Sequence, residues 1–461
     1  MNMPLQRKET NGQLQTVEFS DFTGGINSSV APQLLAGNEY LQIKNFEYDK
    51  NILVTRGGLS APLSTYEENI KALFYDESTN MFLVVLTDNK VYMDNLTDTP
   101  VLAGTLTGNL QPHFCRFDGK IFIASGGKLQ YFEYTNHTLV TITASKLCNF
   151  VFERFGRLVT THTGDDNLYY SAVGDPYETG WTENTSDDSS AKSLEIGYKD
   201  DGDIQKVLPI SGDIAIFKTN GRIYSLAGEY PNWTVQMVGD HSDTVTADGI
   251  TDLGSTIAFM TSSGLKSLEA VQVYGNFSVN TEFARKFNKS LVSGTVYNPK
   301  VYNIYRKRQL LICPDTSNDA GKQKLYCFQY DIGACIYFEF GLPITDMADT
   351  QNNVIIASGA SLYRWSREFS TDNGTAIDQL IETKEFASSR RIYTRMIDIG
   401  IKGTPALSPV YFRWADKLLR YMLGNKRHTI NVFSVCRQDT LKISTQAKVA
   451  VDYVKFYASE V

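Results

Sequence analysis

The sequence predicts an all-β fold, a β-propeller of six to eight blades, and two observations support this expectation. The first is composition: the 461 residues include 26 Tyr, 25 Phe and 34 Gly but only 13 Pro, which suits many strands joined by tight turns. The second is a repeated hairpin formula. In MFLVVLTDNKVYM, residues 81–93, an apolar run is followed by a polar turn and a strand with alternating apolar residues.

The hairpin formula recurs along most of the chain. Its copies are residues 81–93, 120–132 (KIFIASGGKLQYF), 157–171, 214–226 (IAIFKTNGRIYSL), 257–269, 309–328 and 354–365 (VIIASGASLYRW). The shortest intervals between copies match the ~40–50 residues of a four-stranded propeller blade. Two longer intervals contain insertions, a polar loop-like segment at 184–203 and residues 279–294, where we expect a helical turn.

Additional strand candidates precede several hairpins and complete the blades. They are IKALFYD (70–76), QPHFCRFD (111–118), LCNFVFERF (147–155) and IQKVLPISG (204–212). Three to four strands per unit is what a blade requires, and radial packing of blades protects edges that an isolated ribbon would expose. We therefore expect the propeller to span residues 65–375.

Two segments lie outside the repeat. Residues 1–64 form an N-terminal arm or docking segment, with extended pieces on either side of an expected helical stretch at about 34–44. Residues 376–461 contain strand candidates at 393–403, 410–418, 429–437 and 450–458. Because their spacing departs from the blade formula, we expect a separate C-terminal β-sandwich-like domain.

Charge and motif content exclude several classes of function. The net charge is −7 without a basic cluster, which argues against tight binding of nucleic acid. The six cysteines show no zinc-ligand spacing. The sequence contains no run of about 18 apolar residues, so we expect neither a membrane-spanning segment nor an export signal. Nucleophile-elbow, Walker and zinc-protease motifs are absent. We expect no enzyme activity, no catalytic residue, no metal and no cofactor.

Acidic turns are the sharpest local candidates for chemistry. Asp165 and Asp166, and the segment YKDDGD at 198–203, are either turn residues or calcium ligands, and turn geometry favours the first interpretation. DTSNDAG, residues 315–321, resembles half of a calcium loop, but its Gly stands one place late and no Glu follows. The Asp-box turns of sialidase-type propellers are missing. The five His never form a close pair, so we expect structural roles for them.

Aromatic and mixed segments allow two interpretations each. Trp233, Trp365 and Trp414 suit either sugar-stacking platforms or packing between blades, and packing is favoured in a propeller. LLRYMLGNKRH, residues 418–428, suits either a loop that meets a partner or lines a channel, or an ordinary solvated hairpin loop.

Two motifs resemble a known family. FTGGINSSVAPQLLAGNEYLQIKNFEYDKNILVTRGG, residues 22–58, resembles the opening of a family of tailed-phage virion proteins. The matching positions are Phe22, Gly24, Gly25, Asn27, Pro32, Leu34, Asn38, Glu39, Asn45, Arg56 and Gly57. LYYSAVGDPYETGW, residues 168–181, resembles a segment within the propellers of that family. Its matching positions are Tyr170, Ser171, Gly174, Asp175, Pro176 and Trp181.

The resemblance implies a tail tube or nozzle protein of a short-tailed phage. Such a protein forms a homo-oligomeric ring, commonly a hexamer, assembled in the host cytoplasm and located in the virion. It contacts portal-proximal adaptor proteins and the tail fibres or tail tip, and double-stranded DNA passes through its lumen without tight binding. The alternative function is a receptor- or carbohydrate-binding propeller adhesin on a virion or cell surface.

Overall fold

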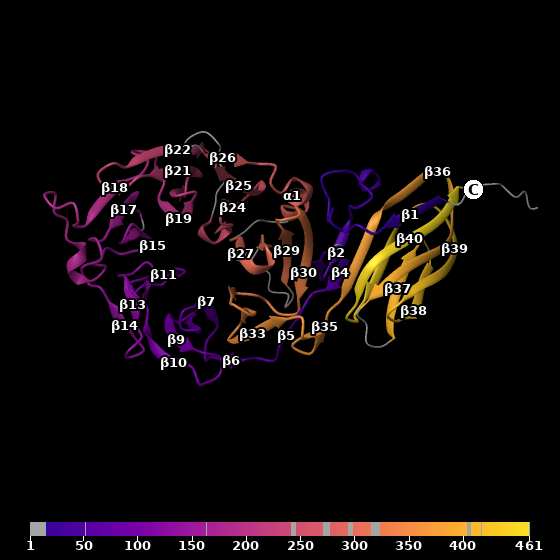
Figure 1. Ribbon diagram of the computed structural model, residues 1–461, viewed down its shortest axis with the longest axis horizontal. Helices are drawn as coiled ribbons and strands as arrows, with labels where there is room; N and C mark the ends of the chain where they lie inside the picture. The colour runs from indigo at the N-terminus through magenta and orange to yellow at the C-terminus, as the bar shows by residue number, and fades with distance from the viewer. Residues whose placement is uncertain are drawn as a thin grey trace, which may run out of the picture. The chain divides into compact units, whose positions relative to one another are not determined.

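A computed structural model describes residues 15–460 except 51, 163, 241–245, 271–276, 294–297, 315–322, 403–406 and 416. The chain packs into two compact units, each followed here by itself (Figure 1). The propeller unit holds residues 59–323 and 341–366, and the terminal unit holds the chain up to Gly58, residues 324–340 and residues 367–461. The expected boundaries at 64/65 and 375/376 stay predictions, whereas packing groups the N- and C-terminal segments together.

The propeller unit contains five consecutive four-stranded antiparallel sheets. The first two contain β7 (Ile70–Asp76), β8 (Met81–Leu86), β9 (Lys90–Asp94), β10 (Val101–Thr105), β11 (His113–Phe117), β12 (Lys120–Ala124), β13 (Gln130–Glu133) and β14 (Thr138–Thr141). The next three contain β15 (Phe150–Arg154), β16 (Arg157–Thr161), β17 (Asn167–Tyr170), β18 (Lys192–Glu195), β19 (Ile204–Ile210), β20 (Asp213–Lys218), β21 (Arg222–Ala227), β22 (Thr234–Asp240), β23 (Ile250–Asp252), β24 (Thr256–Thr261), β25 (Gly264–Ala270) and β26 (Phe277–Asn280).

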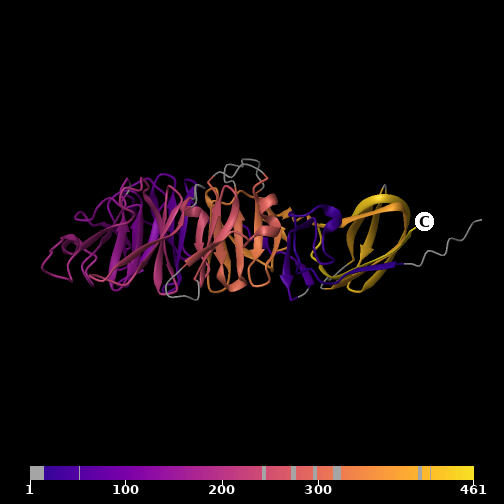
Figure 2. The ribbon, with the colours of Figure 1, turned by 90° about the horizontal axis from the view of Figure 1, so that it is seen from above.

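The remaining strands of this unit close the ring. β27 (Lys300–Ile304) pairs with β28 (Gln309–Cys313), and β31 (Asp346–Asp349), β32 (Val354–Ser358) and β33 (Ser361–Ser366) form the last module. β6 (Ser64–Thr65), from the start of the unit, pairs with β33 at its end. Figure 1 shows the first strands β7, β11, β15 and β19 toward the middle of the ring, and Figure 2 shows the sheets from the side.

The all-β propeller expected from the sequence is confirmed. Six predicted hairpins fall on paired strands, namely β8–β9, β12–β13, β16–β17, β20–β21, β24–β25 and β32–β33. The remaining one, residues 309–328, falls on β28 and β29 (Gln323–Gln329), and its turn lies outside the described residues. In the described residues the propeller unit holds five four-stranded sheets, the β27–β28 pair and the β31–β33 module, within the expected range of six to eight blades.

Packing between neighbouring sheets explains why strand β8, the second strand of its blade, is apolar throughout. In β8, Leu83 and Val85 join a core cluster with Ile121 of the next sheet. Phe82, Val84 and Leu86, which alternate with them along the strand, join a different cluster with Ile355 of the last module. Because side chains alternate across a strand, both faces of β8 are buried against neighbouring sheets, and neither face tolerates polar residues.

The two insertions behave differently. Residues 279–294 contain the predicted helical turn, α1 (Arg285–Leu291), which buries Phe287 and Leu291. Residues 184–203 are not wholly a loop, because they contribute β18, the fourth strand of its sheet. Short 3-10 helices occur at η2 (Glu178–Trp181), η3 (Ala247–Gly249) and η4 (Tyr305–Lys307).

The terminal unit combines strands from both ends of the chain. Its N-terminal elements are β1 (Gln15–Phe19), η1 (Pro32–Leu34), β2 (Gln42–Lys44), β3 (Phe46–Asp49), β4 (Ile52–Thr55) and β5 (Gly58–Leu59), which reaches one residue into the propeller unit. Its later elements are β29, β30 (Ala334–Phe340), β34 (Thr371–Asp372), β35 (Thr375–Ala376), β36 (Gln379–Lys402), β37 (Ser408–Trp414), β38 (Lys417–Leu423), β39 (Arg427–Thr445) and β40 (Ala450–Glu460).

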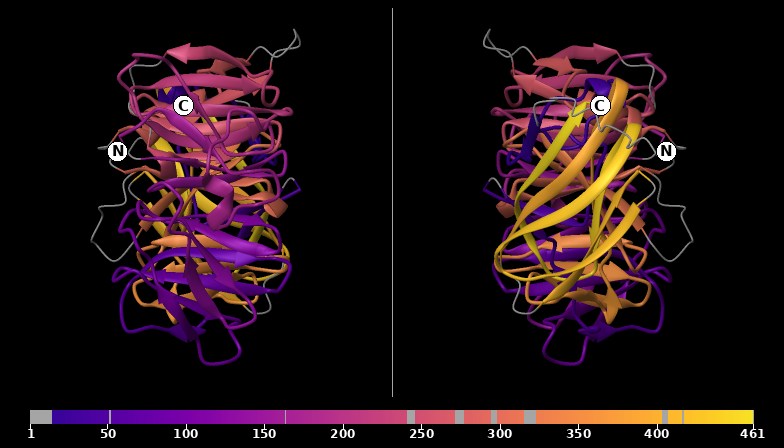
Figure 3. Two further views of the ribbon diagram at one scale, coloured as in Figure 1. Left: turned by 90° about the vertical axis from the view of Figure 1, so that its left-hand side faces the viewer. Right: turned by 90° about the vertical axis from the view of Figure 1, so that its right-hand side faces the viewer.

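Pairing within this unit explains its sandwich-like form. β36 pairs with both β39 and β40, and its register shifts at three points along β39, which lets one 24-residue strand bend through the domain (Figure 3, right). β1 and β4 also pair with β40, so the N-terminal segment is built into the C-terminal sheets.

Two local expectations for this unit were wrong. The helix expected at about 34–44 is absent: η1 ends at Leu34, and β2 then pairs with β36, because strand pairing outweighs the weak helical pattern. The segment 418–428, interpreted as a loop, instead forms most of strand β38 and the turn into β39.

Candidate functional site

The N-terminal motif, residues 22–58, ends at a buried guanidinium in the terminal unit. Arg56 is 1% exposed. Its Nε donates to Asn45 Oδ1 at 2.9 Å, Nη1 donates to the Gly57 carbonyl at 2.8 Å and Asp372 Oδ1 at 2.9 Å, and Nη2 donates to the Glu339 carbonyl at 2.8 Å and Asp372 Oδ2 at 2.6 Å. All five N–H donors of the arginine are used, so this Arg56 network leaves none for a ligand.

The other members of the Arg56 network are equally saturated. Asn45 adopts a left-handed conformation (φ 60°), receives a second hydrogen bond from the Glu339 amide at 2.7 Å and donates to the Asp378 carbonyl at 2.6 Å. The Arg56 Cζ atom lies 4.2 Å from the ring centroid of Phe340. The Arg56 network thus joins three segments that are far apart in the sequence.

The two glycines of the motif allow close backbone approach. A Cβ on Gly24 would lie 2.2 Å from the Asn38 carbonyl oxygen. Gly25 has φ 63°, and a Cβ there would lie 2.7 Å from the Cys335 amide nitrogen. Glycine is therefore required at both positions by local packing.

Side chains around these glycines complete a second structural cluster. Asn27 Nδ2 donates to Glu39 Oε2 at 2.8 Å, and Phe22 is fully buried and stacks on Tyr40 at 5.5 Å between centroids. Pro32 opens η1, where its fixed φ suits the first position. The structure therefore gives each of these motif residues a role in positioning backbone.

The second motif forms the loop between β17 and β18 of the propeller unit. Ser171 Oγ accepts a hydrogen bond from the Leu158 amide at 3.0 Å, and Gly174 has φ 70°. Asp175 Oδ1 accepts from the Tyr177 amide at 2.9 Å, while Trp181 Nε1 donates to the Pro176 carbonyl at 2.9 Å. These residues shape the loop, and Tyr170 and Val173 of the same segment line a cavity treated below.

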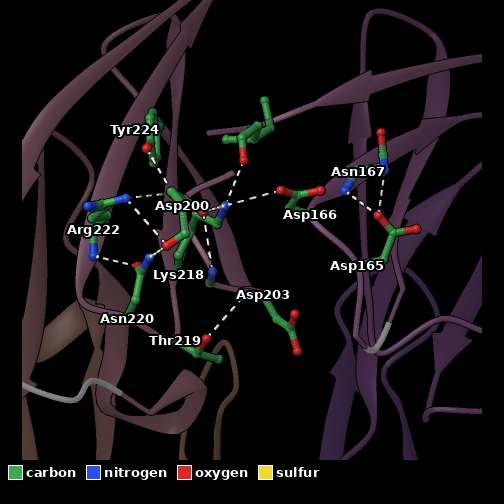
Figure 4. A network of polar contacts seen from close by, with 12 residues as sticks. Asp165, Asp166, Asn167, Asp200, Asp203, Lys218, Thr219, Asn220, Arg222 and Tyr224 are labelled. Atoms are coloured by element: carbon green, nitrogen blue, oxygen red, sulfur yellow. Dashed lines mark hydrogen bonds and ion pairs between the residues drawn. The ribbon is translucent and has the colours of Figure 1, made fainter. Parts of the chain in front are cut away.

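The acidic turns are satisfied by protein partners (Figure 4). Asp200 forms an ion pair with Lys218, whose side chain is fully buried, and accepts from the Tyr224 hydroxyl at 2.8 Å. Asp166 lies 3.7 Å from the same ammonium, and Asp165 accepts from the Asn167 amide at 2.8 Å. Their geometry fits turns and an ion pair. The possible calcium loop at 315–321 lies outside the described residues.

A group of titratable side chains gathers at the inner strands of the propeller. This axial cluster consists of His113, Lys206, Asp248, Lys300 and Asp346, all half-buried. The Nζ atom of Lys206 donates to the Ala247 and Ile250 carbonyls at 2.8 and 2.7 Å, that of Lys300 donates to the Thr345 carbonyl at 2.8 Å, and Asp346 accepts from the Leu73 amide at 2.7 Å. The cluster therefore ties neighbouring blades together across the ring.

Burial shifts three pKa values in the axial cluster. It raises the pKa of Asp346 to about 6 and lowers the pKa of Lys206 to about 8. Burial, followed by the charge of Lys206, lowers the pKa of His113 to about 4. At neutral pH the histidine is neutral and both other groups are charged, so neighbouring Asp and Lys charges offset one another.

Other reactive residues belong mainly to the core. None of the six cysteines forms a disulfide bond; Cys148, Cys313, Cys327 and Cys335 are buried, and Cys115 and Cys436 are half-buried. Trp365 and Trp414 are buried at 2% and 1% exposure, as packing predicts, whereas Trp233 is half-buried and lines a cavity. In the described part of the chain, no three His, Cys, Asp or Glu side chains are grouped as metal ligands.

His428 is positioned by the turn between β38 and β39, where its Nε2 lies 3.0 Å from the Gly424 amide nitrogen. His137 stacks on Phe132 at 6.4 Å, and His241 lies outside the described residues. Within the described residues, none of the helices combines the length and apolar character needed to cross a bilayer.

No protein-family model matches the chain, and no curated protein matches its sequence. The extracellular domain of BT4673 from B. thetaiotaomicron aligns with 88% of this chain and 63% of its own length, at 10% identity and TM-score 0.49. The WD40 propeller domain of Doa1 aligns with 68% of this chain and 96% of its own, at 12% identity and TM-score 0.44. The chain thus spans less than two thirds of the BT4673 domain, and the likeness concerns the fold alone.

Proposed function

We propose that the chain is a structural protein of a phage tail and forms one subunit of a tail-tube or nozzle ring. In this role the propeller supplies a rigid body and the terminal unit supplies contacts to neighbouring copies, to adaptor proteins and to fibres. The negative net charge of −7 suits a conduit that DNA passes without sticking. A hexamer follows from the resemblance to the phage family.

The observation that carries the proposal is an open, apolar sheet edge in the terminal unit. β38 pairs with β37 in unbroken register from Ser408↔Leu423 to Trp414↔Lys417, and in the described residues its other edge pairs with no strand. Leu418 is 68% exposed and Met422 is 49% exposed on this strand. A regular edge with exposed apolar side chains is a template for pairing with a second copy.

Comparable edges of the propeller are protected. β10 and β22 are edge strands with exposed apolar residues, but their register shifts interrupt regular pairing. Such bulges twist an edge and disfavour addition of another strand. The contrast favours the β38 edge as the contact between subunits.

The saturated motif residues support the same role. The Arg56 network and the glycine cluster fix the path of the N-terminal segment within the terminal unit, and they leave no converging groups for catalysis. Motif residues whose polar groups are all used within the fold suit a protein that assembles with others better than one that converts a substrate.

Sedimentation velocity and native mass spectrometry of the full chain test the proposal. We expect the wild type to form a closed oligomer and the variant Leu418→Lys/Met422→Lys to shift to monomer. Leu102→Lys/Met237→Lys is the matched control, because these residues are 50% and 51% exposed on β10 and β22. A wild type that stays monomeric contradicts the ring, and dissociation only in the control pair contradicts assignment of the contact to β38.

A further inference from the structure

A cavity of ≈ 330 Å³ lies between two neighbouring blades of the propeller unit. Three loops form it: the turn between β15 and β16, the loop between β17 and β18, and the loop between β21 and β22. Its lining residues are Arg154, Phe155, Arg157, Tyr170, Val173, Asp188, Ser189, Glu229, Tyr230 and Trp233. A volume near the lower end of the range for small-molecule sites suits a ligand about the size of one sugar ring.

Two buried guanidiniums line the cavity without an ion pair. Arg154 is 7% exposed and Arg157 is 8% exposed. Nearby carboxylates act on them through space, Glu153, Asp213 and Glu229 on Arg154 and Asp187 and Glu229 on Arg157, but in the described residues none forms a salt bridge with either. Burial lowers the pKa of both side chains. Because none of these carboxylates contacts a guanidinium directly, a negatively charged group of a ligand that does so would stabilise the two buried charges.

The two arginines differ in how their donors are used. Arg157 donates to the Ser171, Ser190 and Asp188 carbonyls at 2.7, 2.6 and 2.5 Å, which holds its side chain in place. Arg154 donates through Nη2 to the Gly228 carbonyl at 2.9 Å, but its Nε is buried without a partner in the described structure. Arg154 is therefore the side chain with a free donor.

Tyr170 presents a second unsatisfied polar atom at the same place. It is 3% exposed, and its hydroxyl has no hydrogen-bond partner in the described structure. Buried polar atoms are usually paired, so the Tyr170 hydroxyl and the Arg154 Nε are two groups of the same lining that would gain stability from a polar partner.

Aromatic rings form the side of the cavity. Trp233 stacks on Tyr170 with 5.0 Å between ring centroids and meets the edge of Tyr230 at 5.3 Å. Phe155 and Val173, at the rim, are 51% and 52% exposed. Flat apolar surfaces beside polar groups are suited to the C–H face of a sugar ring, which has one apolar side and hydroxyls around its edge.

The cavity lining also carries negative charge. Asp188 and Glu229 are exposed lining residues, whereas the two arginines are buried. Their carboxylates would repel the successive phosphates of a nucleic-acid strand but can accept hydrogen bonds from hydroxyl groups. Buried positive charges combined with exposed negative ones favour a ligand with a single anionic group on a hydroxyl-rich ring over a polyanion.

We propose that this cavity binds an acidic monosaccharide unit, such as a uronic or sialic acid residue of a surface polysaccharide. Its carboxylate faces Arg154 and Arg157, its ring packs on Trp233, and a ring oxygen or hydroxyl pairs with the Tyr170 hydroxyl. The inference does not rest on the phage-tail proposal, because one subunit contains the whole cavity.

Saturation-transfer NMR with the full chain tests the proposal, using glucuronic acid and N-acetylneuraminic acid as probes. A single sugar of this size should bind with a Kd on the order of 1 mM. Glucose and inorganic phosphate serve as matched ligands that lack the carboxylate or the ring, and both should bind at least tenfold more weakly than the better acid. Comparable binding of either, or no binding of both acids, overturns the proposal, as does preferential binding of oligo(dT).

Two variants separate ligand contact from folding. Arg154→Gln should weaken binding at least tenfold, and Tyr170→Phe should weaken it about threefold or more while raising the midpoint of thermal unfolding, because it removes an unpaired buried hydroxyl. Tyr305→Ala and Arg395→Gln alter exposed residues outside the cavity and should leave binding unchanged. Wild-type affinity in folded Tyr170→Phe and Arg154→Gln proteins would contradict the assignment.

Discussion

Two buried arginines show how the same side chain serves opposite purposes. Arg56 of the terminal unit uses all five donors and has Asp372 as its counter-charge. Arg154 of the propeller unit has an unpaired Nε and no salt bridge with the described carboxylates. The difference teaches that a saturated buried cation holds the fold together, whereas an unsaturated one marks a place where the fold leaves binding energy for a ligand.

Of the substitutions that test this comparison, Arg56→Lys should have the largest effect on stability. Lysine keeps the positive charge but cannot reproduce the planar fork that reaches Asn45, Asp372 and two carbonyls. We expect a loss of about 3–5 kcal/mol in the free energy of unfolding, as for other broken buried pairs. Urea denaturation measures it.

Arg395→Lys, at an exposed position of the same unit, is the control for Arg56→Lys and should change stability by less than about 0.5 kcal/mol. A change below about 1 kcal/mol for Arg56→Lys itself would show that the network does not hold the terminal unit together.

A pH series tests the axial cluster, in which the buried charges are only partly compensated by neighbouring groups. The folded pKa of Asp346 is raised to about 6, so the wild type loses stability as pH rises from about 4 through 6. Asp346→Asn removes this loss and keeps an acceptor for the Leu73 amide. The variant should gain about 1–3 kcal/mol relative to the wild type across that interval, measured by denaturation at each pH.

His113 provides the internal control for the pH series. Its pKa is lowered to about 4, so it favours the folded state as pH rises from about 4 to 6.5 and opposes the trend of Asp346. His113→Asn should therefore make the loss of stability with rising pH steeper than in the wild type. A difference between Asp346→Asn and wild type that does not change with pH would contradict the assigned shift.

The smallest expected effect concerns two tyrosines. Tyr170→Phe removes an unpaired buried hydroxyl and should raise stability by about 1 kcal/mol. Tyr66→Phe removes a hydroxyl that donates to Asp94 Oδ2 at 2.5 Å, and should lower stability by about 1–3 kcal/mol. Thermal unfolding distinguishes them by the sign of the change, and the same sign for both would contradict the satisfaction argument.

The propeller could be predicted from the sequence because residues close together in the chain encode each of its hairpins. Each blade repeats an alternating hairpin, and strand β8 is apolar at every position because both of its faces meet other sheets. The 3-10 turn at η1 and strand β38 were missed, since pairing with partners distant in the chain decided them.

The candidate sites depended on contacts that no local pattern encodes. Arg56 meets Asp372, which lies 316 residues later in the chain. The cavity combines three loops of two blades, so the sequence favoured Trp233 as a packing residue and singled out neither Arg154 nor Arg157. Arg154 ends the first strand of its blade and Tyr170 ends the third, while Trp233 precedes the last strand of the next blade. The sequence alone does not show that these positions meet.

Electron microscopy of the purified wild-type chain tests the central claim, self-assembly into a closed conduit, most directly. We expect annular particles of uniform subunit number, because contacts between copies must close by rotation to form a ring. Single isolated subunits at every concentration, or open filaments, would contradict the account.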